Sequence, residues 1–140
     1  MIGAIIVKKL AGSGSDALSR HDLPKFMASF AKDCTLTYPG NFSMSGEWKG
    51  KKAIEGWMAK MMKQFPGIDF NIKETYISNI FALGATNNLA IEWDITNIDR
   101  EGKEFHNSGV TTIRLKGGKI VAVRDYYFNT DLLKEAWGEA

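Results

Sequence analysis

The sequence predicts an α+β fold in which helices pack on one face of a mainly antiparallel sheet. Apolar residues recur at helical spacing through roughly the first 65 of the 140 residues. From Asp69 onward the pattern changes to the alternation that is typical of strands, with tight-turn signals between them. A block of helices followed by a block of strands is typical of α+β domains, and this length suits one domain over residues 1–140.

The helical part divides into three segments. The first is either one continuous helix or a helix interrupted at "GSGS", with an apolar face of Ile5, Ile6, Leu10, Ala17 and Leu18. A second helix begins at Asp22, has Pro24 in its first turn, and continues through Phe26, Met27 and Phe30. After the short strand "CTLTYPG", the stretch "GKKAIEGWMAKMMKQFPG" predicts a third helix that stops at Pro66-Gly67.

Four strands are expected after the helices, at about 69–80, 88–98, 104–116 and 119–128. The turns between them set the register. "KGGK" suggests a two-residue loop that places Lys116 opposite Lys119 and Val110 opposite Asp125. "DREGK" fits a three-residue loop with Gly102 in the left-handed position, which places Asp94 opposite Ser108. "NTDLLKEAWG" closes the chain as a short helix, capped by Asn129 or Thr130.

This register divides the sheet into two faces, and a one-residue error in a loop would exchange the faces of a strand. One face is expected to carry Glu92, Asp94, Thr96, His106, Ser108, Val110, Thr112, Arg114, Val121, Val123, Asp125 and Tyr127. The other is expected to carry Leu89, Ile91, Trp93, Ile95, Phe105, Ile113, Leu115, Ile120, Tyr126 and Phe128.

The candidate site centres on Asp125, whose strand also carries Val121 and Val123 on the same expected face. If this face lines a cavity, desolvation raises the pKa of Asp125 and suits it to give or take a proton near neutral pH. The alternative is that Asp125 accepts hydrogen bonds from Tyr38, Ser108 or the backbone and only orders the core.

Three further groups have two interpretations each. Asp94 and Glu92 either enter the cavity, where crowding with another carboxylate would keep one of them protonated, or decorate a solvated face. His106 is either an acid–base partner or a structurally bonded histidine.

With Asp125 facing inward, the other, apolar face would be outermost; it carries Trp93, Ile95, Phe105, Ile113 and Phe128. Because so large an apolar patch does not stay exposed to water, we expect a homodimer through this outer sheet face.

Composition narrows the function classes. A net charge of +2 gives no argument for nucleic acid or a membrane as partner. The single Cys34 excludes an internal disulfide, so we expect a cytoplasmic protein and a core-filling cysteine. In "MIGAIIVKKL" the lysines follow the apolar run, which is the wrong order for a secretory signal. No residue spacing suggests a metal site or a cofactor.

Four stretches, in this order, carry a family resemblance: "HDLPKFMASFAKDCTLTYPG", "GKKAIEGWM", "FPG" and "GGKIVAVRDYYFN". Together they resemble the SnoaL-like branch of the nuclear transport factor 2-like superfamily, which includes polyketide cyclases, ketosteroid isomerase and limonene epoxide hydrolase. The resemblance implies a cone-shaped, curved, mainly antiparallel sheet with N-terminal helices packed on its concave face. It also implies a cavity between the sheet and the helices.

The resemblance to limonene epoxide hydrolase implies catalytic roles for Asp125, Asp94 and Tyr38. Asn41 could correspond to that enzyme's water-holding asparagine, whereas Glu92 occupies the position of its arginine. We expect substrate contacts from Asn41, Trp57, Glu92, His106, Ser108, Val110, Val123 and Tyr127.

The function expected from this resemblance is cofactor-free acid–base catalysis: isomerisation, cyclisation or water addition. Its substrate would be a small apolar molecule, such as a ketone, epoxide, terpenoid or polyketide-like compound. The alternative is a non-catalytic module of the same fold that binds a lipophilic ligand or serves dimerisation.

Overall fold

The sheet has six strands, in the spatial order β2-β1-β6-β5-β4-β3. The strands are β1 (Phe30–Tyr38), β2 (Gly46–Lys49), β3 (Gly67–Ile77), β4 (Asn87–Ile98), β5 (Glu104–Lys116) and β6 (Lys119–Tyr127). β1 and β6 run parallel, and all other neighbours pair antiparallel. The helices are α1 (Ile2–Ser19), α2 (Leu23–Met27), α3 (Lys51–Gln64) and α4 (Asp131–Ala136).

This computed structural model describes residues 2–79 and 86–139, without the side chains of residues 2–4, 6 and 7. The side chain of Ile6 in the first predicted helix and residue 80 at the end of a predicted strand therefore lie outside the described residues.

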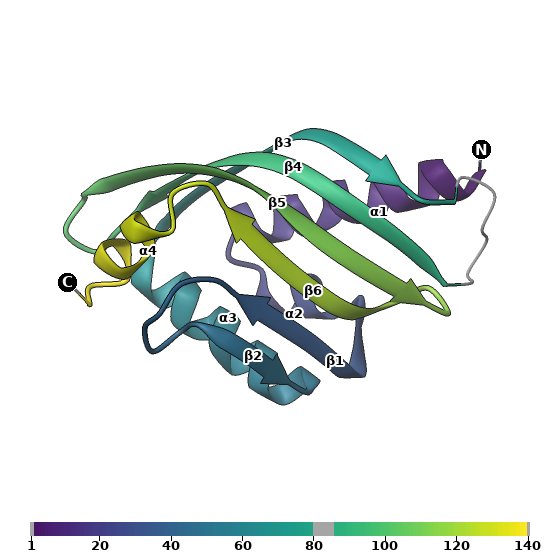
Figure 1. Cartoon of the computed structure of the whole chain (residues 1–140), viewed down its shortest axis with the longest axis horizontal. Helices are drawn as coiled ribbons and strands as arrows, with labels where there is room; N and C mark the ends of the chain where they lie inside the picture. The colour runs from purple at the N-terminus through teal and green to yellow at the C-terminus, as the bar shows by residue number, and fades with distance from the viewer. Residues whose placement is uncertain (1, 80–85, 140) are drawn as a thin grey trace.

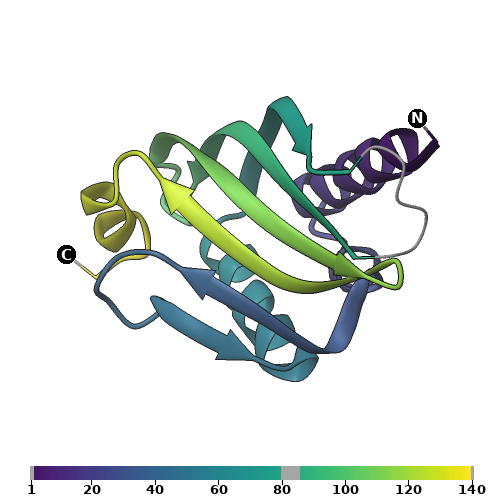
Figure 2. The same ribbon diagram turned by 45° about the vertical axis from the view of Figure 1, so that its right-hand side comes forward.

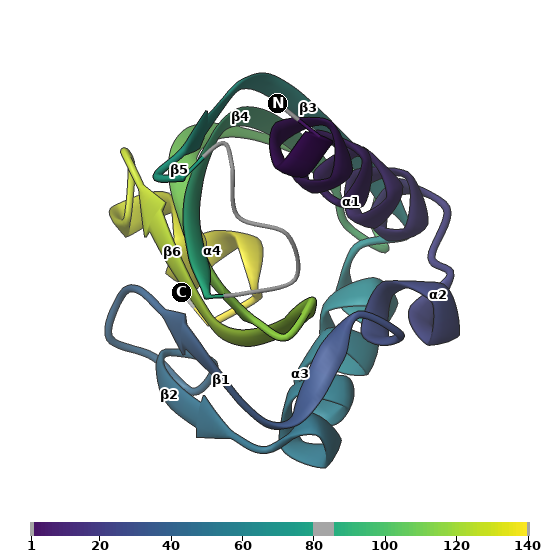
Figure 3. The ribbon, with the colours of Figure 1, turned by 90° about the vertical axis from the view of Figure 1, so that its right-hand side faces the viewer.

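The sheet is curved, and α1, α2 and α3 lie along its concave side (Figure 1). Turned by 45°, the molecule presents the convex side of the sheet, with β6 and β1 in front of α3 (Figure 2). Seen end-on, the sheet wraps from β3 round to β2 and the three helices occupy the open side of the curve (Figure 3). The predicted α+β fold, with its N-terminal helices on the concave face, is confirmed.

The helices differ from expectation in their limits. α1 runs without interruption through Gly12 and Gly14. α2 begins as predicted, because the Asp22 carboxylate accepts the backbone N–H of Lys25 at 3.2 Å. It ends early, however, and Phe30 already belongs to β1.

The predicted hairpin turns are confirmed. Gly102 has φ +85°, and the glycines of "KGGK", Gly117 and Gly118, have φ +57° and +77°. Lys116 pairs with Lys119, and Asp94 pairs with Ser108 as expected. Sequence analysis missed the short strand β2, which is an edge strand of four residues with no buried side chain.

A β-bulge beside the last turn overturns the predicted faces. Leu115 pairs with Ile120, but the next pair along the hairpin is Arg114 with Ala122, so Val121 has no partner of its own on β5. One extra residue on β6 moves every later pair by one position. Asp125 therefore lies opposite Thr111, and the prediction that it lies opposite Val110 is wrong.

The consequence is that β4 and β5 present their apolar side chains to the helices, together with Asp125. The inward residues of β4 are Leu89, Ile91, Trp93 and Ile95, all at most 5% exposed. Most of the apolar face expected on the outside is therefore the interior of the molecule, and this buried part gives no reason for a dimer. Of the residues on that face, Tyr126 and Phe128 are exposed as expected. Cys34 is also fully buried.

Candidate functional site

A cavity of about 140 Å³ lies between the concave face of the sheet and the helices. α1, α2 and α3 line one side of it, and all the strands except β2 line the other. The walls are almost entirely aliphatic and aromatic. Among the described residues, Lys25 and Asp125 are the only charged ones that line it, and the Lys25 ammonium lies 3.3 Å from Asp16 in an exposed ion pair.

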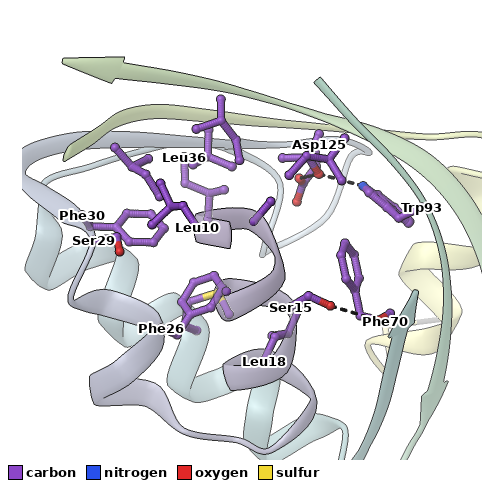
Figure 4. A pocket seen from close by; sticks show the side chains of 18 of the residues that line it. Leu10, Ser15, Leu18, Phe26, Ser29, Phe30, Leu36, Phe70, Trp93 and Asp125 are labelled. Atoms are coloured by element: carbon purple, nitrogen blue, oxygen red, sulfur yellow. Dashed lines mark hydrogen bonds between the residues drawn. The ribbon is translucent and has the colours of Figure 1, made fainter. Parts of the chain in front are cut away.

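A chain of two hydrogen bonds holds Asp125 (Figure 4). The Thr111 hydroxyl donates to Oδ1 of Asp125 at 2.6 Å. The indole Nε1–H of Trp93 in turn donates to Oγ1 of Thr111 at 2.8 Å. Three strands therefore cooperate, because β6 supplies the carboxylate, β5 the hydroxyl and β4 the indole.

Gly109 makes room for this chain. It pairs with Trp93 on one side and with Tyr127 on the other. A Cβ at this position would lie 2.8 Å from the Trp93 ring and would collide with the carbonyl oxygen of Tyr126. The absence of a side chain therefore lets the indole lie across β5 toward Thr111.

Burial gives Asp125 its distinctive chemistry. Desolvation in the apolar interior raises the pKa of this carboxyl to about 6, and the hydrogen bond from Thr111 opposes the rise. A group with that pKa exists in both protonation states near neutral pH. The prediction that Asp125 faces an apolar interior is confirmed by its position in the cavity wall.

Two tyrosines stand beside the carboxylate. Tyr38 and Tyr127 line the cavity, and their ring centroids lie 5.5 Å apart. The Tyr38 hydroxyl accepts a hydrogen bond from Nε1 of Trp137 at 3.2 Å. Burial raises the pKa of both phenols, so both remain protonated hydrogen-bond donors at neutral pH.

Trp57 and Val123 also line the cavity, as expected. The Trp57 ring packs against Tyr38 in a tilted arrangement, with 4.7 Å between ring centroids and 56° between the ring planes. Its Nε1–H donates to the carbonyl oxygen of Met44 at 3.0 Å. The indole therefore offers a ligand only its apolar surface.

Asp94 and Ser108 do not face the cavity, contrary to expectation. They lie on the convex side because the bulge reverses the assignment of β4 and β5. The Ser108 hydroxyl donates to Oδ1 of Asp94 at 2.6 Å, and the Lys73 ammonium lies 3.9 Å from Oδ2. The Asp94 side chain is 51% exposed.

Glu92, His106 and Val110 lie on the same convex side, for the same reason. Glu92 accepts a hydrogen bond from the Tyr76 hydroxyl at 3.2 Å. His106 is bonded to the Thr96 hydroxyl at 2.9 Å, which fits the structural interpretation of this histidine.

Asn41 is exposed in the loop between β1 and β2 and does not line the cavity. With Asp94 and Glu92 outside as well, the group of two carboxylates and an asparagine that the epoxide hydrolase resemblance implied is not assembled.

Sequence reasoning missed Thr111 and Trp93 as parts of the site. The signal that could have found them is the apolar alternation of β4, where Leu89, Ile91, Trp93 and Ile95 share one face. Placing that face inward places Trp93, and its neighbour Thr111, beside Asp125.

The sequence itself identifies the family. Residues 15–123 match the sequence profile of the SnoaL-like domain. The chain belongs to the SnoaL-like family. No curated protein matches the chain.

Solved structures share the fold of this SnoaL-like protein at low sequence identity. Bal32a, from a soil-derived mobile gene cassette, superposes with a TM-score of 0.82 at 17% identity, over 96% of this chain and 98% of its own. A Mycobacterium tuberculosis protein in complex with estradiol-17beta-hemisuccinate gives 0.75 at 22% identity, over 90% and 95%. A Catenulispora acidiphila protein with a ketosteroid isomerase-like fold, in complex with trimethylamine, gives 0.69 at 19%, over 89% of each chain.

Within residues 2–79 and 86–139, no three His, Cys, Asp or Glu side chains gather closely enough to hold a metal ion. No helix in these ranges has the length and apolarity to span a membrane.

Proposed function

We propose that this protein carries out cofactor-free acid–base chemistry on a small, largely apolar molecule held in the cavity, with Asp125 as the proton carrier. The observation that supports this most is the placement of one carboxyl group, with a pKa of about 6, in an otherwise apolar wall. Such a group can take a proton from one carbon or oxygen atom of a ligand and return it to another.

Isomerisation and cyclisation fit this arrangement because both can proceed with one proton carrier and neutral hydrogen-bond donors. Tyr38 provides a neutral donor on the same wall, and Tyr127 supports it through a hydrogen bond between the two hydroxyls. Water addition by a pair of aspartates does not fit, because Asp94 lies on the other face of the sheet. Polyketide cyclase-like or ketosteroid isomerase-like chemistry is therefore the finer proposal.

The size of the cavity restricts the ligand. Its volume, about 140 Å³, is close to the ~150 Å³ of an engineered apolar cavity that binds benzene. We therefore expect a molecule with about one ring and one polar group. The estradiol hemisuccinate and trimethylamine bound to the two structural neighbours support small-molecule binding as the role of this interior.

A ligand screen tests the proposal. Native mass spectrometry against small ketones, epoxides and terpenoids should find a bound compound of about one ring, and carbon-13 NMR should then follow its conversion. Carboxyl-carbon NMR of the free protein should give Asp125 a pKa near 6. An ordinary aspartate titration would contradict the proposed chemistry.

Binding without catalysis is the second candidate, and one observation favours it. Among the described residues, the cavity wall holds one carboxylate and no basic group other than the exposed Lys25. A ligand that binds tightly but remains chemically unchanged during prolonged incubation would establish this alternative.

A homodimer through the convex sheet face remains a prediction, and Tyr126 and Phe128 are the residues of the expected apolar face that are exposed there. Tyr76, Tyr126 and Phe128 are exposed, and Tyr76 and Tyr126 line a hollow there together with Arg114 and Arg124. Arg114 pairs with Asn88 of β4, and the acidic Glu92 lies four residues farther along that strand, roughly 14 Å away at ~3.4 Å per residue. A two-fold axis could therefore bring arginines of one copy opposite acidic groups of the other.

Sedimentation at low micromolar concentration tests this arrangement. We expect a dimer that Arg124→Glu weakens, and a stable monomer would contradict it.

The cytoplasm remains the expected location of the protein.

A further inference from the structure

The two oxygen atoms of Asp125 have different surroundings. Oδ1 accepts the hydroxyl of Thr111, whereas Oδ2 has no hydrogen-bond partner among the described residues. Among the described residues, the only fully buried side-chain nitrogen or oxygen atom without a hydrogen-bond partner is Oδ1 of Asn97. Oδ2 of Asp125 is therefore accessible, and it faces the cavity that this residue lines. The carboxylate is therefore anchored at one oxygen and open at the other.

Chemistry fixes the direction of the first hydrogen bond in the chain. An indole nitrogen can only donate, so Oγ1 of Thr111 must act as the acceptor of the bond from Trp93. While Asp125 is ionised, its carboxylate can only accept, so the single proton of the Thr111 hydroxyl lies in the 2.6 Å contact with Oδ1. If Oδ1 were protonated instead, Oγ1 would have to accept two hydrogen bonds and turn its own proton away from the carboxyl group.

From this geometry we propose that Trp93 and Thr111 are positioning residues that keep Oδ1 of Asp125 as a permanent acceptor and reserve Oδ2 as the atom that carries the proton. The inference rests on the proposed function, because it names the atom at which that chemistry occurs. Gly109 contributes to the same arrangement, because the absence of a side chain there leaves space for the Trp93 ring.

Other titratable groups do not complicate the interpretation. Those that line the cavity are Tyr38 from β1, Tyr127 from β6 and Lys25 from α2. Burial keeps the two phenols neutral in the range where Asp125 titrates. Lys25 is exposed and paired with Asp16. The described lining residues of α1, α3, β3, β4 and β5 include no titratable side chain.

The test is carboxyl-carbon NMR of ligand-free protein, which measures the pKa of Asp125 whether or not a substrate exists. Thr111→Val removes the donor to the carboxylate and should raise this pKa by about one unit. Thr111→Ser keeps the hydroxyl and should restore the original value. Ser108→Ala removes the equivalent hydroxyl on the convex face and should leave the pKa of Asp125 unchanged.

Trp93 is tested by replacing its N–H without changing its shape. Benzothienylalanine at position 93 substitutes sulfur for the indole nitrogen, which frees the Thr111 hydroxyl to accept from a protonated carboxyl group. We expect the pKa of Asp125 to rise by about half a unit, although the indole N–H donates to Thr111 and not to the carboxylate. This variant also covers the case in which Thr111→Val fails to fold.

The Thr111 hydroxyl proton distinguishes the two oxygen atoms, because Oγ1 can accept from the indole whichever oxygen is protonated. If Oδ2 takes the proton, the hydroxyl keeps donating to Oδ1, and its proton resonance stays that of a bonded hydroxyl throughout the titration of Asp125. A move of this resonance to the unbonded position on protonation, or a pKa that neither Thr111→Val nor the position-93 variant changes in a folded protein, would overturn the proposal. Failure to find any substrate would count against the proposed function alone.

Discussion

Two aspartates on this sheet have almost the same local hydrogen bonding and very different surroundings. Thr111 donates to Asp125 at 2.6 Å, and Ser108 donates to Asp94 at 2.6 Å, each across a strand pair. Asp94 has water and Lys73 around it. Asp125 has an apolar cavity and no described cation beside it. The difference teaches that desolvation, rather than the hydrogen bond, makes a carboxylate on this sheet a candidate for proton transfer.

The largest expected effect is a difference in kcat between variants of the two aspartates. Asp125→Asn removes the proton carrier and should lower kcat for a substrate of the cavity by about 100- to 10,000-fold. Asp94→Asn makes the same change on the convex face and should leave kcat within about twofold of the wild type. Steady-state kinetics of both variants measure the contrast. Equal losses would mean that the face of the sheet does not decide function.

How much of this contrast could be predicted from sequence depends on one residue. The α+β fold, the strands other than β2 and both hairpin turns follow from periodicity and turn chemistry, and so does the pairing of Asp94 with Ser108. Val121 carries no local signal of a bulge, because it is an ordinary β-branched strand residue. Counting residues from the "KGGK" turn therefore assigned the side chains of β4 and β5 to the wrong faces of the sheet.

Burial energetics would have corrected the count. Burying a large apolar side chain contributes about 1.5–3 kcal/mol, and β4 offers four of them on one face. The summed free energy of burial exceeds the cost of disrupting one position of the β-ladder at a bulge. When the apolar alternation of a strand and the register counted from a turn disagree, the apolar alternation should therefore decide which face points inward. Thr111 and Trp93 could be found this way, but the bond distances among them could not.

The second prediction concerns stability against pH. The folded-state pKa of Asp125, about 6, lies above its ordinary value of 3.8, so the folded state binds the proton more tightly than the unfolded state does. Stability from this group is fully present below about pH 4 and is lost as pH rises through about 6. A shift of roughly two units corresponds to about 3 kcal/mol.

Urea denaturation between pH 4 and pH 8 measures this loss. Asp125→Asn should match the wild type at pH 4 and exceed its free energy of unfolding by up to about 3 kcal/mol at pH 8. Asp94→Asn should differ from the wild type by no more than about 0.5 kcal/mol throughout, as exposed substitutions usually do. A constant difference between Asp125→Asn and the wild type would show that Asp125 is not desolvated.

The third prediction concerns the packing beneath the inner site. Gly109→Ala should lower the free energy of unfolding by about 2 kcal/mol, because its Cβ would meet the Trp93 ring and the Tyr126 carbonyl oxygen. The control is Gly12→Ala in α1, whose Cβ would meet nothing within 4 Å and should stabilise the helix by up to about 1 kcal/mol. Equal effects at the two glycines would contradict the tight fit of Trp93.

The smallest expected effect compares the interior cavity with the hollow on the convex face as ligand sites. Ala11 of α1 lines the cavity, and Ala11→Leu should fill part of its volume of about 140 Å³. We expect ligand affinity to fall about tenfold, with stability nearly unchanged because alanine and leucine are both strong helix formers. Ala122→Leu adds the same side chain in the convex hollow and should leave affinity unaltered. Isothermal titration of both variants decides between the faces, because a loss confined to Ala122→Leu would place the ligand outside, where Asp125 could not reach it.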